Sequence, residues 1–188
     1  MRAFIAADIP SAIQETFALI QEKLHYSGAI IKWVKPSDIH LTLRFLGEVK
    51  EDKIGELCSA VEKALRGVQP FPVSFGGLGS FPEHGYPRVI WAGIKEGDDE
   101  LGAIAEKLRD LPEGCGEPPE KIRFAAHATL GRVKENRNIT ALRRSLEDPK
   151  TAEVITGCGG YILRSLTLMR TAPGPLYTPL KTFSLTTI

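Results

Sequence analysis

Two short segments of the chain carry a histidine followed two residues later by a threonine. The first segment, IHLTLRFLGE, contains His40 and Thr42, and the second, AHATLGR, contains His127 and Thr129. Both segments alternate apolar and other residues, which is the pattern of a half-buried strand. Side chains at positions i and i+2 of a strand leave the same face, so each histidine shares a face with its threonine.

These residue types suit reactions at a phosphate group. Imidazole has an unperturbed pKa of about 6.5, so near neutral pH one copy can accept a proton while another donates one. Threonine hydroxyls can hydrogen-bond the non-bridging oxygens of a phosphodiester. A single histidine on a strand is more often structural, but the repeated arrangement favours one shared catalytic site. His-x-Thr supplies no further ligands at a spacing that suits a metal, so we expect no metal site.

Strict alternation makes predictions for several neighbours of these residues. Phe45 has the opposite parity from His40 and is predicted to lie in the core. Arg132 has the opposite parity from His127, so it reaches the site only if the strand bends or ends near Gly131; otherwise it is a solvated charge at the strand end. Four residues elsewhere have simpler interpretations: His25 and His84 as surface or cap residues, Trp91 as core, and Arg88 as a charge on the surface or in contact with a ligand.

The remaining pattern predicts two successive strand–helix units, paired antiparallel strands and further helices. A Ser11–Gln14 capping box is expected to begin the first helix. The His-x-Thr segments and the helices that follow them resemble each other, which indicates two related lobes. The expected helices are 11–24, 51–65, 98–111 and 138–148, and the expected strands are 4–7, 39–48, 71–77, 87–94, 126–132, 161–170 and 176–187.

Composition narrows the class of protein. The chain has 188 residues, 43% of them hydrophobic, with 24 Lys plus Arg against 23 Asp plus Glu. This size and apolar content suit one globular domain, and the near-zero net charge means that any nucleic-acid contact must be local. Three widely spaced cysteines indicate reduced thiols, and no segment reads as a signal peptide or membrane span. We therefore expect a soluble, cytoplasmic protein without a membrane partner and, by default, a monomer.

The motifs resemble a known family. HLTLRFLGE and HATLGR are similar to the two signatures of the two-histidine (2H) phosphoesterase superfamily. MRAFIAADIP, GLGSFPEHGYPRVIWAGI and LRSLTLMRTAPGPLYTPL resemble other segments of its RNA 2′,3′-cyclic phosphodiesterase branch, also called 2′-5′ RNA ligases. The resemblance spans nearly the whole chain. It implies a single bilobal α+β domain, residues 1–188, with two pseudo-symmetric antiparallel-sheet lobes and outer helices around a central cleft.

The resemblance also implies an activity and a set of roles. The substrate would be RNA with a 2′,3′-cyclic phosphate end, hydrolysed to a 2′-phosphomonoester without a cofactor. His40 would be the proton donor to the departing 3′ oxygen and His127 the proton acceptor that activates water. Thr42, Thr129 and Arg132 would bind the phosphate.

The sequence departs from the family pattern at one position, and three alternatives to the predicted activity remain. Many members have proline before the second histidine, where this chain has Ala126, which loosens the backbone restriction at the entry to the strand. The alternatives are 2′-5′ RNA ligation as the reverse reaction, a non-catalytic module that binds RNA ends, and a cyclic phosphodiesterase for small nucleotides. No nucleotide-binding signature such as a P-loop is evident that would let ATP drive ligation, which favours hydrolysis.

Overall fold

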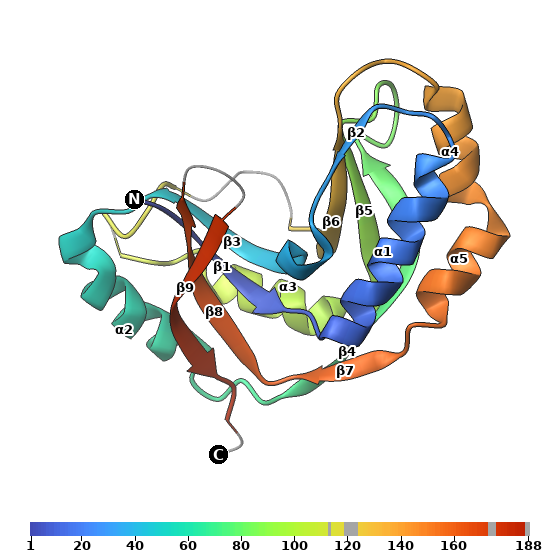
Figure 1. Ribbon diagram of the computed structural model, residues 1–188. Helices are drawn as coiled ribbons and strands as arrows, with labels where there is room; N and C mark the ends of the chain where they lie inside the picture. Colours follow the sequence, from blue (N-terminus) through green and yellow to red (C-terminus); the bar gives the residue numbers. More distant parts are fainter. Residues whose placement is uncertain (113, 119–123, 173–175, 187–188) are drawn as a thin grey trace.

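The computed structural model describes residues 1–112, 114–118, 124–172 and 176–186. The described residues form one nine-stranded sheet and five α-helices (Figure 1). The helices are α1 (Ser11–His25), α2 (Ile54–Leu65), α3 (Asp98–Lys107), α4 (Ile139–Glu147) and α5 (Pro149–Thr156), with short 3₁₀ turns η1 (Pro36–Asp38) and η2 (Glu51–Lys53). The strands are β1 (Arg2–Asp8), β2 (Ile31–Trp33), β3 (His40–Glu48), β4 (Phe71–Phe81), β5 (Val89–Glu96), β6 (His127–Val133), β7 (Gly160–Leu163), β8 (Ser165–Ala172) and β9 (Leu176–Ser184).

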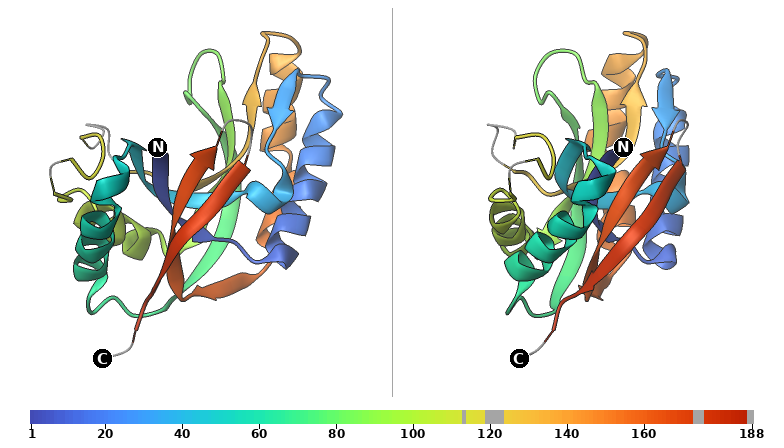
Figure 2. Two further views of the ribbon diagram at one scale, coloured as in Figure 1. Left: turned by 60° about the vertical axis from the view of Figure 1, so that its left-hand side comes forward. Right: turned by 90° about the vertical axis from the view of Figure 1, so that its left-hand side faces the viewer.

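The sheet curls into two lobes, which confirms the expected bilobal α+β architecture. Its strand order is β7-β4-β5-β6-β3-β1-β8-β9, with β2 paired to β6, and the neighbouring strands are antiparallel. In the first lobe, β3, β1, β8 and β9 are covered by α2 and α3. In the second lobe, β7, β4, β5, β6 and β2 are covered by α1, α4 and α5 (Figures 1 and 2). The inner faces of the two lobes border an opening between them.

The two lobes share one continuous sheet instead of carrying two separate sheets. β3 of the first lobe and β6 of the second meet through the register pair Leu41 and Ala128. Both side chains are buried on the outer, helix-covered face of the sheet. The lobes are therefore fixed to each other at the point where the two His-x-Thr segments lie.

Helical spacing predicted the buried face of α1 correctly. Ile13, Phe17, Ile20 and Leu24 are all buried, and the ring of Phe17 packs edge-on against Phe75 at 5.0 Å between centroids. The Ser11–Gln14 capping box is wrong. Pro10 occupies the N-cap position, and no side chain caps the helix. Because the fixed φ of proline suits a helix start, Pro10 takes the capping position expected for Ser11, and the serine is the first residue of the helix.

The other differences concern short elements. β2 has only three residues, too few to show alternation, and α5 begins at Pro149 directly behind the expected fourth helix. The Asp148 side chain caps α5 by accepting a hydrogen bond from the Lys150 amide at 3.0 Å. The third expected helix ends at Lys107 instead of 111, and the tail segment 161–170 is divided into β7 and β8. The Pro/Gly turn expected at 173–175 lies outside the described residues.

None of the helices in the described part of the chain has the length and apolar character needed to cross a bilayer. All three cysteines are free thiols, with Cys58 and Cys115 buried and Cys158 half-buried.

Gln21 is a buried polar residue that ties α1 to the strands of the second lobe. Its Nε2 donates hydrogen bonds to the carbonyl oxygens of Val34 at 2.7 Å and Leu130 at 2.9 Å. Gln21→Leu removes both of these hydrogen bonds. The Leu130 carbonyl keeps the bond from the Val34 amide at 2.9 Å, but the Val34 carbonyl loses its Gln21 donor, so we expect the free energy of unfolding to fall by about 1–3 kcal/mol. Urea unfolding measures this. Glu22→Leu places the same side chain at an exposed neighbour and should change stability by less than about 0.5 kcal/mol. Equal effects of the two substitutions would contradict the assigned role.

Candidate active site

The two His-x-Thr segments meet at the one register pair described between β3 and β6. Leu41 is the middle residue of the first segment, Ala128 is the middle residue of the second, and the two are partners in an antiparallel register. Continuing this register by one residue each way sets His40 beside Thr129 and, on the other side, Thr42 beside His127. The histidines then lie diagonally, with Cβ atoms about 7 Å apart. Two imidazoles in this arrangement can act from opposite sides on one group held between them.

Both imidazoles are held by the same backbone contact. Nδ1 of His40 lies 2.7 Å from the carbonyl oxygen of Asp38, and Nδ1 of His127 lies 2.7 Å from that of Ala125. A carbonyl oxygen only accepts, so Nδ1 donates and carries the proton in each ring. Nε2 is then the atom that gains or loses a proton. The same i−2 contact in both lobes supports the expected relation between the two segments.

Aromatic side chains fix the orientation of each ring further. Phe4 stacks on His40 with 4.7 Å between centroids and 22° between planes, and Tyr177 meets the same imidazole edge-on at 5.2 Å. Phe81 meets His127 edge-on at 5.0 Å. Packing of this kind restricts the rotamers of both histidines, which keeps Nε2 in a defined place.

Burial lowers the pKa of both histidines below the usual value of about 6.5. For His40, the hydrogen bond to the Asp38 carbonyl and the nearby carboxylates of Asp8 and Asp38 act against burial and raise the pKa. For His127, the hydrogen bond to the Ala125 carbonyl raises the pKa, but the nearby cation of Arg132 lowers it further. The charges around the two rings therefore have opposite signs.

Arg132 lies at the cleft because β6 carries a bulge. Thr129 pairs with Trp91 and Gly131 pairs with Ile90, so Leu130 is an extra residue on β6. A bulge reverses the alternation beyond it. Arg132 therefore lies on the same side of the sheet as Thr129, facing the cleft. The sequence alone had left open whether the strand bends enough for this, and Arg132 lines a cavity together with His40.

Phe45 also lies at the cleft, and the prediction that it belongs to the core is wrong. The β1–β3 register shifts twice, so that Thr42 pairs with Ala6 but Phe45 pairs with Phe4. The shift next to Leu43 changes the parity of the strand. Phe45 is 57% exposed, and its ring centroid lies 6.2 Å from that of Phe4.

Trp91, also expected in the core, is half-buried on the cleft face. It pairs with Thr129 across β5 and β6, and its ring lies 5.2 Å from that of Phe81. Gly79 makes room for the indole, because a Cβ atom there would lie 2.4 Å from it. His25 and His84 are exposed and outside the cleft, which confirms their predicted places, and Arg88 is exposed.

Two cavities adjoin at the residues that the lobes bring together. The apolar cavity, about 510 Å³, is walled by Phe45, Phe81 and Phe124 and reaches His127. The polar cavity, about 360 Å³, is lined by Asp38, His40, Arg132 and Tyr177. Both are bordered by Thr42, Phe45 and Thr129. A molecule with a phosphate at this shared border can place an apolar group in one cavity and charged groups in the other.

Comparison with known proteins gives this geometry a family. Residues 7–91 match the family model of LigT-like phosphoesterases. A protein of Methanothermobacter thermautotrophicus named RNA 2′,3′-cyclic phosphodiesterase is 33% identical over 188 residues, covering 98% of this chain and 99% of the relative. The chain belongs to the LigT-like phosphoesterase family. A protein of Archaeoglobus fulgidus with the same name is 35% identical and covers 97% of this chain and 99% of the relative.

Two solved structures share the whole fold. E. coli LigT complexed with 3′-AMP aligns with a TM-score of 0.76 and 27% identity, covering 99% of this chain and 98% of LigT. A Thermus thermophilus protein aligns with a TM-score of 0.77 and 26% identity, covering 98% of both chains. The resemblance of the sequence to the 2H phosphoesterases is thus confirmed.

Several residues of this LigT-like phosphoesterase site were not evident from the sequence. The carbonyls of Asp38 and Ala125 belong to the backbone and carry no residue signal, although both stand two positions before a histidine. Phe4 and Tyr177 come from opposite ends of the chain and meet only because β1 and β9 both flank β8. Asp8 is the register partner of His40, and this also depends on strand pairing.

Proposed function

We propose that this LigT-like phosphoesterase hydrolyses the 2′,3′-cyclic phosphate at the 3′ end of RNA to a 2′-phosphomonoester, with one histidine from each lobe as acid and base and without a metal. The observation that carries the proposal is the diagonal pair of imidazoles, each with Nδ1 bound to a backbone carbonyl. The names and coverage of the relatives support the RNA substrate. Because each lobe supplies one histidine, residues 1–188 act as a single domain.

The reaction follows from the positions of the four side chains. The cyclic phosphate lies at the border of the two cavities, where the hydroxyls of Thr42 and Thr129 donate hydrogen bonds to its non-bridging oxygens. Nε2 of neutral His127 takes a proton from water as the water oxygen bonds to phosphorus. The bond from phosphorus to O3′ breaks, and Nε2–H of protonated His40 gives its proton to O3′. The product carries a 2′-phosphate and a 3′-hydroxyl, and exchange with solvent restores both protonation states.

The charges around the rings support this assignment of roles. A general acid must be protonated before the reaction, and the carboxylates of Asp8 and Asp38 favour the protonated form of His40. A general base must be neutral, and the cation of Arg132 favours the neutral form of His127. Arg132 lies at the polar cavity and also attracts the phosphate.

Asp8→Asn should shift one limb of the pH profile of kcat/KM, the alkaline limb, to lower pH. In the free enzyme, activity requires neutral His127 and protonated His40, so the profile is bell-shaped. Burial lowers both pKa values, which places the maximum on the acid side of about 6.5. Asp8 raises the pKa of His40, so its neutralisation should move the alkaline limb to lower pH and leave the acid limb in place. A shift of the alkaline limb to higher pH, or a shift of the acid limb alone, would contradict the assignment.

The apolar cavity suits the base of the terminal nucleotide. It is walled by aromatic rings, and nucleobases stack on such rings with little dependence on sequence. Glu106 and Arg109 also line this cavity and form an ion pair, with 3.5 Å between Oε2 and Nε. A base held there places its ribose and cyclic phosphate beside His127 and Thr129.

The proposal is tested with purified protein in EDTA, a labelled RNA ending in 2′,3′-cyclic phosphate, and an RNA with a free 5′-hydroxyl. We expect a 2′-phosphate as the main product. A joined 2′-5′ product in excess would make ligation, the reverse reaction with exchanged histidine roles, the principal activity. Tight binding without any product would favour an RNA-end binding module. Turnover of cyclic mononucleotides but not of RNA would favour a phosphodiesterase for small nucleotides.

A further inference from the structure

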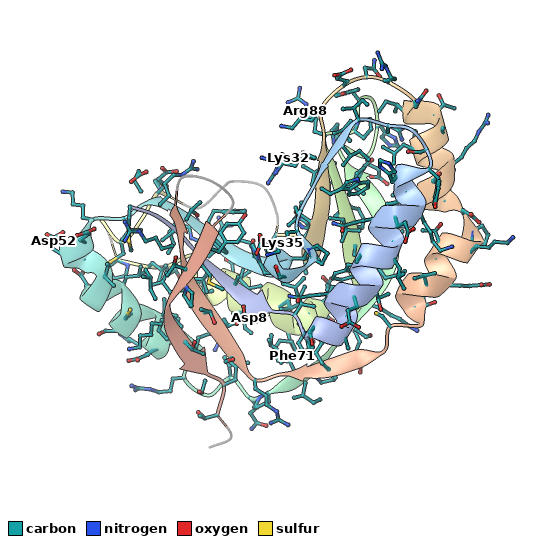
Figure 3. The ribbon with its side chains drawn as sticks, viewed as in Figure 1. Asp8, Lys32, Lys35, Asp52, Phe71 and Arg88 are labelled. Atoms are coloured by element: carbon teal, nitrogen blue, oxygen red, sulfur yellow. The ribbon has the colours of Figure 1, made fainter. Side chains whose placement is uncertain are left out.

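A row of cations lies on the edge of the second lobe beside the polar cavity. Lys32 on β2 is the register partner of Arg132 on β6, and Arg132 also pairs with Val89 on β5. Arg88, the residue before Val89, accepts a hydrogen bond from the Val133 amide at 2.9 Å through its carbonyl. Strand pairing sets Lys32 beside Arg132, and Arg88 directly precedes β5 next to them. Figure 3 shows the side chains of Lys32 and Arg88 on this edge, with Lys35 nearer the base of the opening.

These cations are available to a ligand. Lys32, Arg88 and Arg132 are exposed, and none takes part in the ion pairs found among the described residues. The chain as a whole has a net charge of +1, so this row is a local excess of positive charge and not part of a general one. An unpaired row of this kind attracts a polyanion locally.

The size and position of the row fit a nucleic-acid backbone. Neighbouring strands are about 4.8 Å apart, so β2, β6 and β5 span about 10 Å. A stacked single strand has one phosphate per about 3.4 Å, so this edge covers two or three phosphates. Arg132, in the middle of the row, lines the polar cavity and lies beside the position proposed for the cyclic phosphate.

We propose that the single-stranded RNA body, 5′ of the reacting end, leaves the cleft along this edge with its phosphates against Lys32 and Arg88. The inference rests on the proposed function, because it takes the cyclic phosphate at the border of the cavities as its starting point. The terminal base enters the apolar cavity, whose wall includes Ala105 of α3 and Arg109 just beyond it, so the RNA chain continues through the polar cavity. Contacts to phosphates do not depend on sequence, so this edge binds RNA of any sequence and favours oligonucleotides over mononucleotides.

The test compares two substrates and two double variants. The substrates are a nucleoside 2′,3′-cyclic phosphate and a hexanucleotide RNA with the same terminal nucleotide. Lys32→Ala/Arg88→Ala should lower kcat/KM for the hexanucleotide about 10-fold and leave that for the mononucleotide within about 2-fold. It should also reduce the salt slope of log kcat/KM for the hexanucleotide by about 1.4, because two phosphate contacts are lost. Lys23→Ala/Lys150→Ala removes the same charge from exposed positions on α1 and α5 and should change neither substrate.

Equilibrium binding separates this inference from the proposed function. The anisotropy of a labelled hexanucleotide with a 2′-phosphate end reports RNA binding without turnover, and its Kd should rise about 10-fold in Lys32→Ala/Arg88→Ala. If the wild-type protein turns over neither substrate but this difference in Kd is found, the proposed function fails and the binding edge stands. An unchanged Kd, or equal losses of kcat/KM on both substrates, would overturn the binding edge.

Discussion

Replacing either His40 or His127 with alanine is expected to lower kcat by about 10²–10⁴-fold, the usual contribution of one acid or base group. Each imidazole lies on the cleft face of its strand, apart from the buried core formed on the helix-covered face. The substitutions therefore remove the proton carrier without opening a cavity in that core. The measurement is single-turnover hydrolysis of RNA ending in 2′,3′-cyclic phosphate, with urea unfolding of each variant alongside.

Two other histidines serve as controls for this prediction. His25→Ala and His84→Ala remove exposed imidazoles away from the cleft and should leave kcat unchanged. Loss of folding in both cleft variants, with an unchanged rate per folded molecule, would contradict the acid-base role. It would show instead that His40 and His127 serve the packing of Phe4, Tyr177 and Phe81.

Exchanging the two cleft threonines for valine should produce the next largest loss. Thr42→Val and Thr129→Val keep the shape and branching of the side chain and remove only the hydroxyl. A hydrogen bond to a charged group contributes about 1.5–3 kcal/mol, so each substitution should lower kcat/KM by about 10–10²-fold. The double variant should lose about 10²–10⁴-fold if the two hydroxyls bind different oxygens of the phosphate.

The division of this loss between kcat and KM shows when the hydroxyls act. A fall in kcat means that they bind the transition state more tightly than the substrate, whereas a rise in KM alone means equal binding of both. Thr178→Val makes the same exchange at an exposed position on β9 and should be neutral. Full activity of the Thr42 and Thr129 double variant would contradict the role of both hydroxyls in binding the phosphate.

Local periodicity predicted much of this fold and part of the site. Spacing alone predicted that His40 shares a strand face with Thr42, and His127 with Thr129. Side chains two positions apart lie on the same face of any strand. Spacing predicted the wrong face for Phe45 and did not determine the face of Arg132. Both residues lie beyond bulges, where the strand has one residue more than its partner. Bulges arise from pairing with a second strand, so a single segment of sequence does not show them.

The rest of the site depends on pairing between strands that are far apart in the sequence. The sequence indicated two related lobes, but the pair Leu41 and Ala128 that joins them links positions far apart in the chain. The same holds for Asp8 beside His40 and for the ring of Tyr177, which reaches the imidazole from β9. Helix faces such as that of α1 were predictable because their spacing is local, whereas the three residues of β2 were too few to show a pattern.

The paired-histidine mechanism is tested most directly with a substrate whose leaving group needs no proton. In an RNA end with sulfur in place of the bridging 3′ oxygen, the 3′ thiolate leaves without a general acid, since a thiol has a pKa near 8.5. We predict that the deficit of His40→Ala shrinks to within about 10-fold on this substrate, while His127→Ala keeps its full deficit of about 10²–10⁴-fold. Recovery of His127→Ala instead, or equal deficits in both variants, would contradict the assignment of His40 as acid and His127 as base.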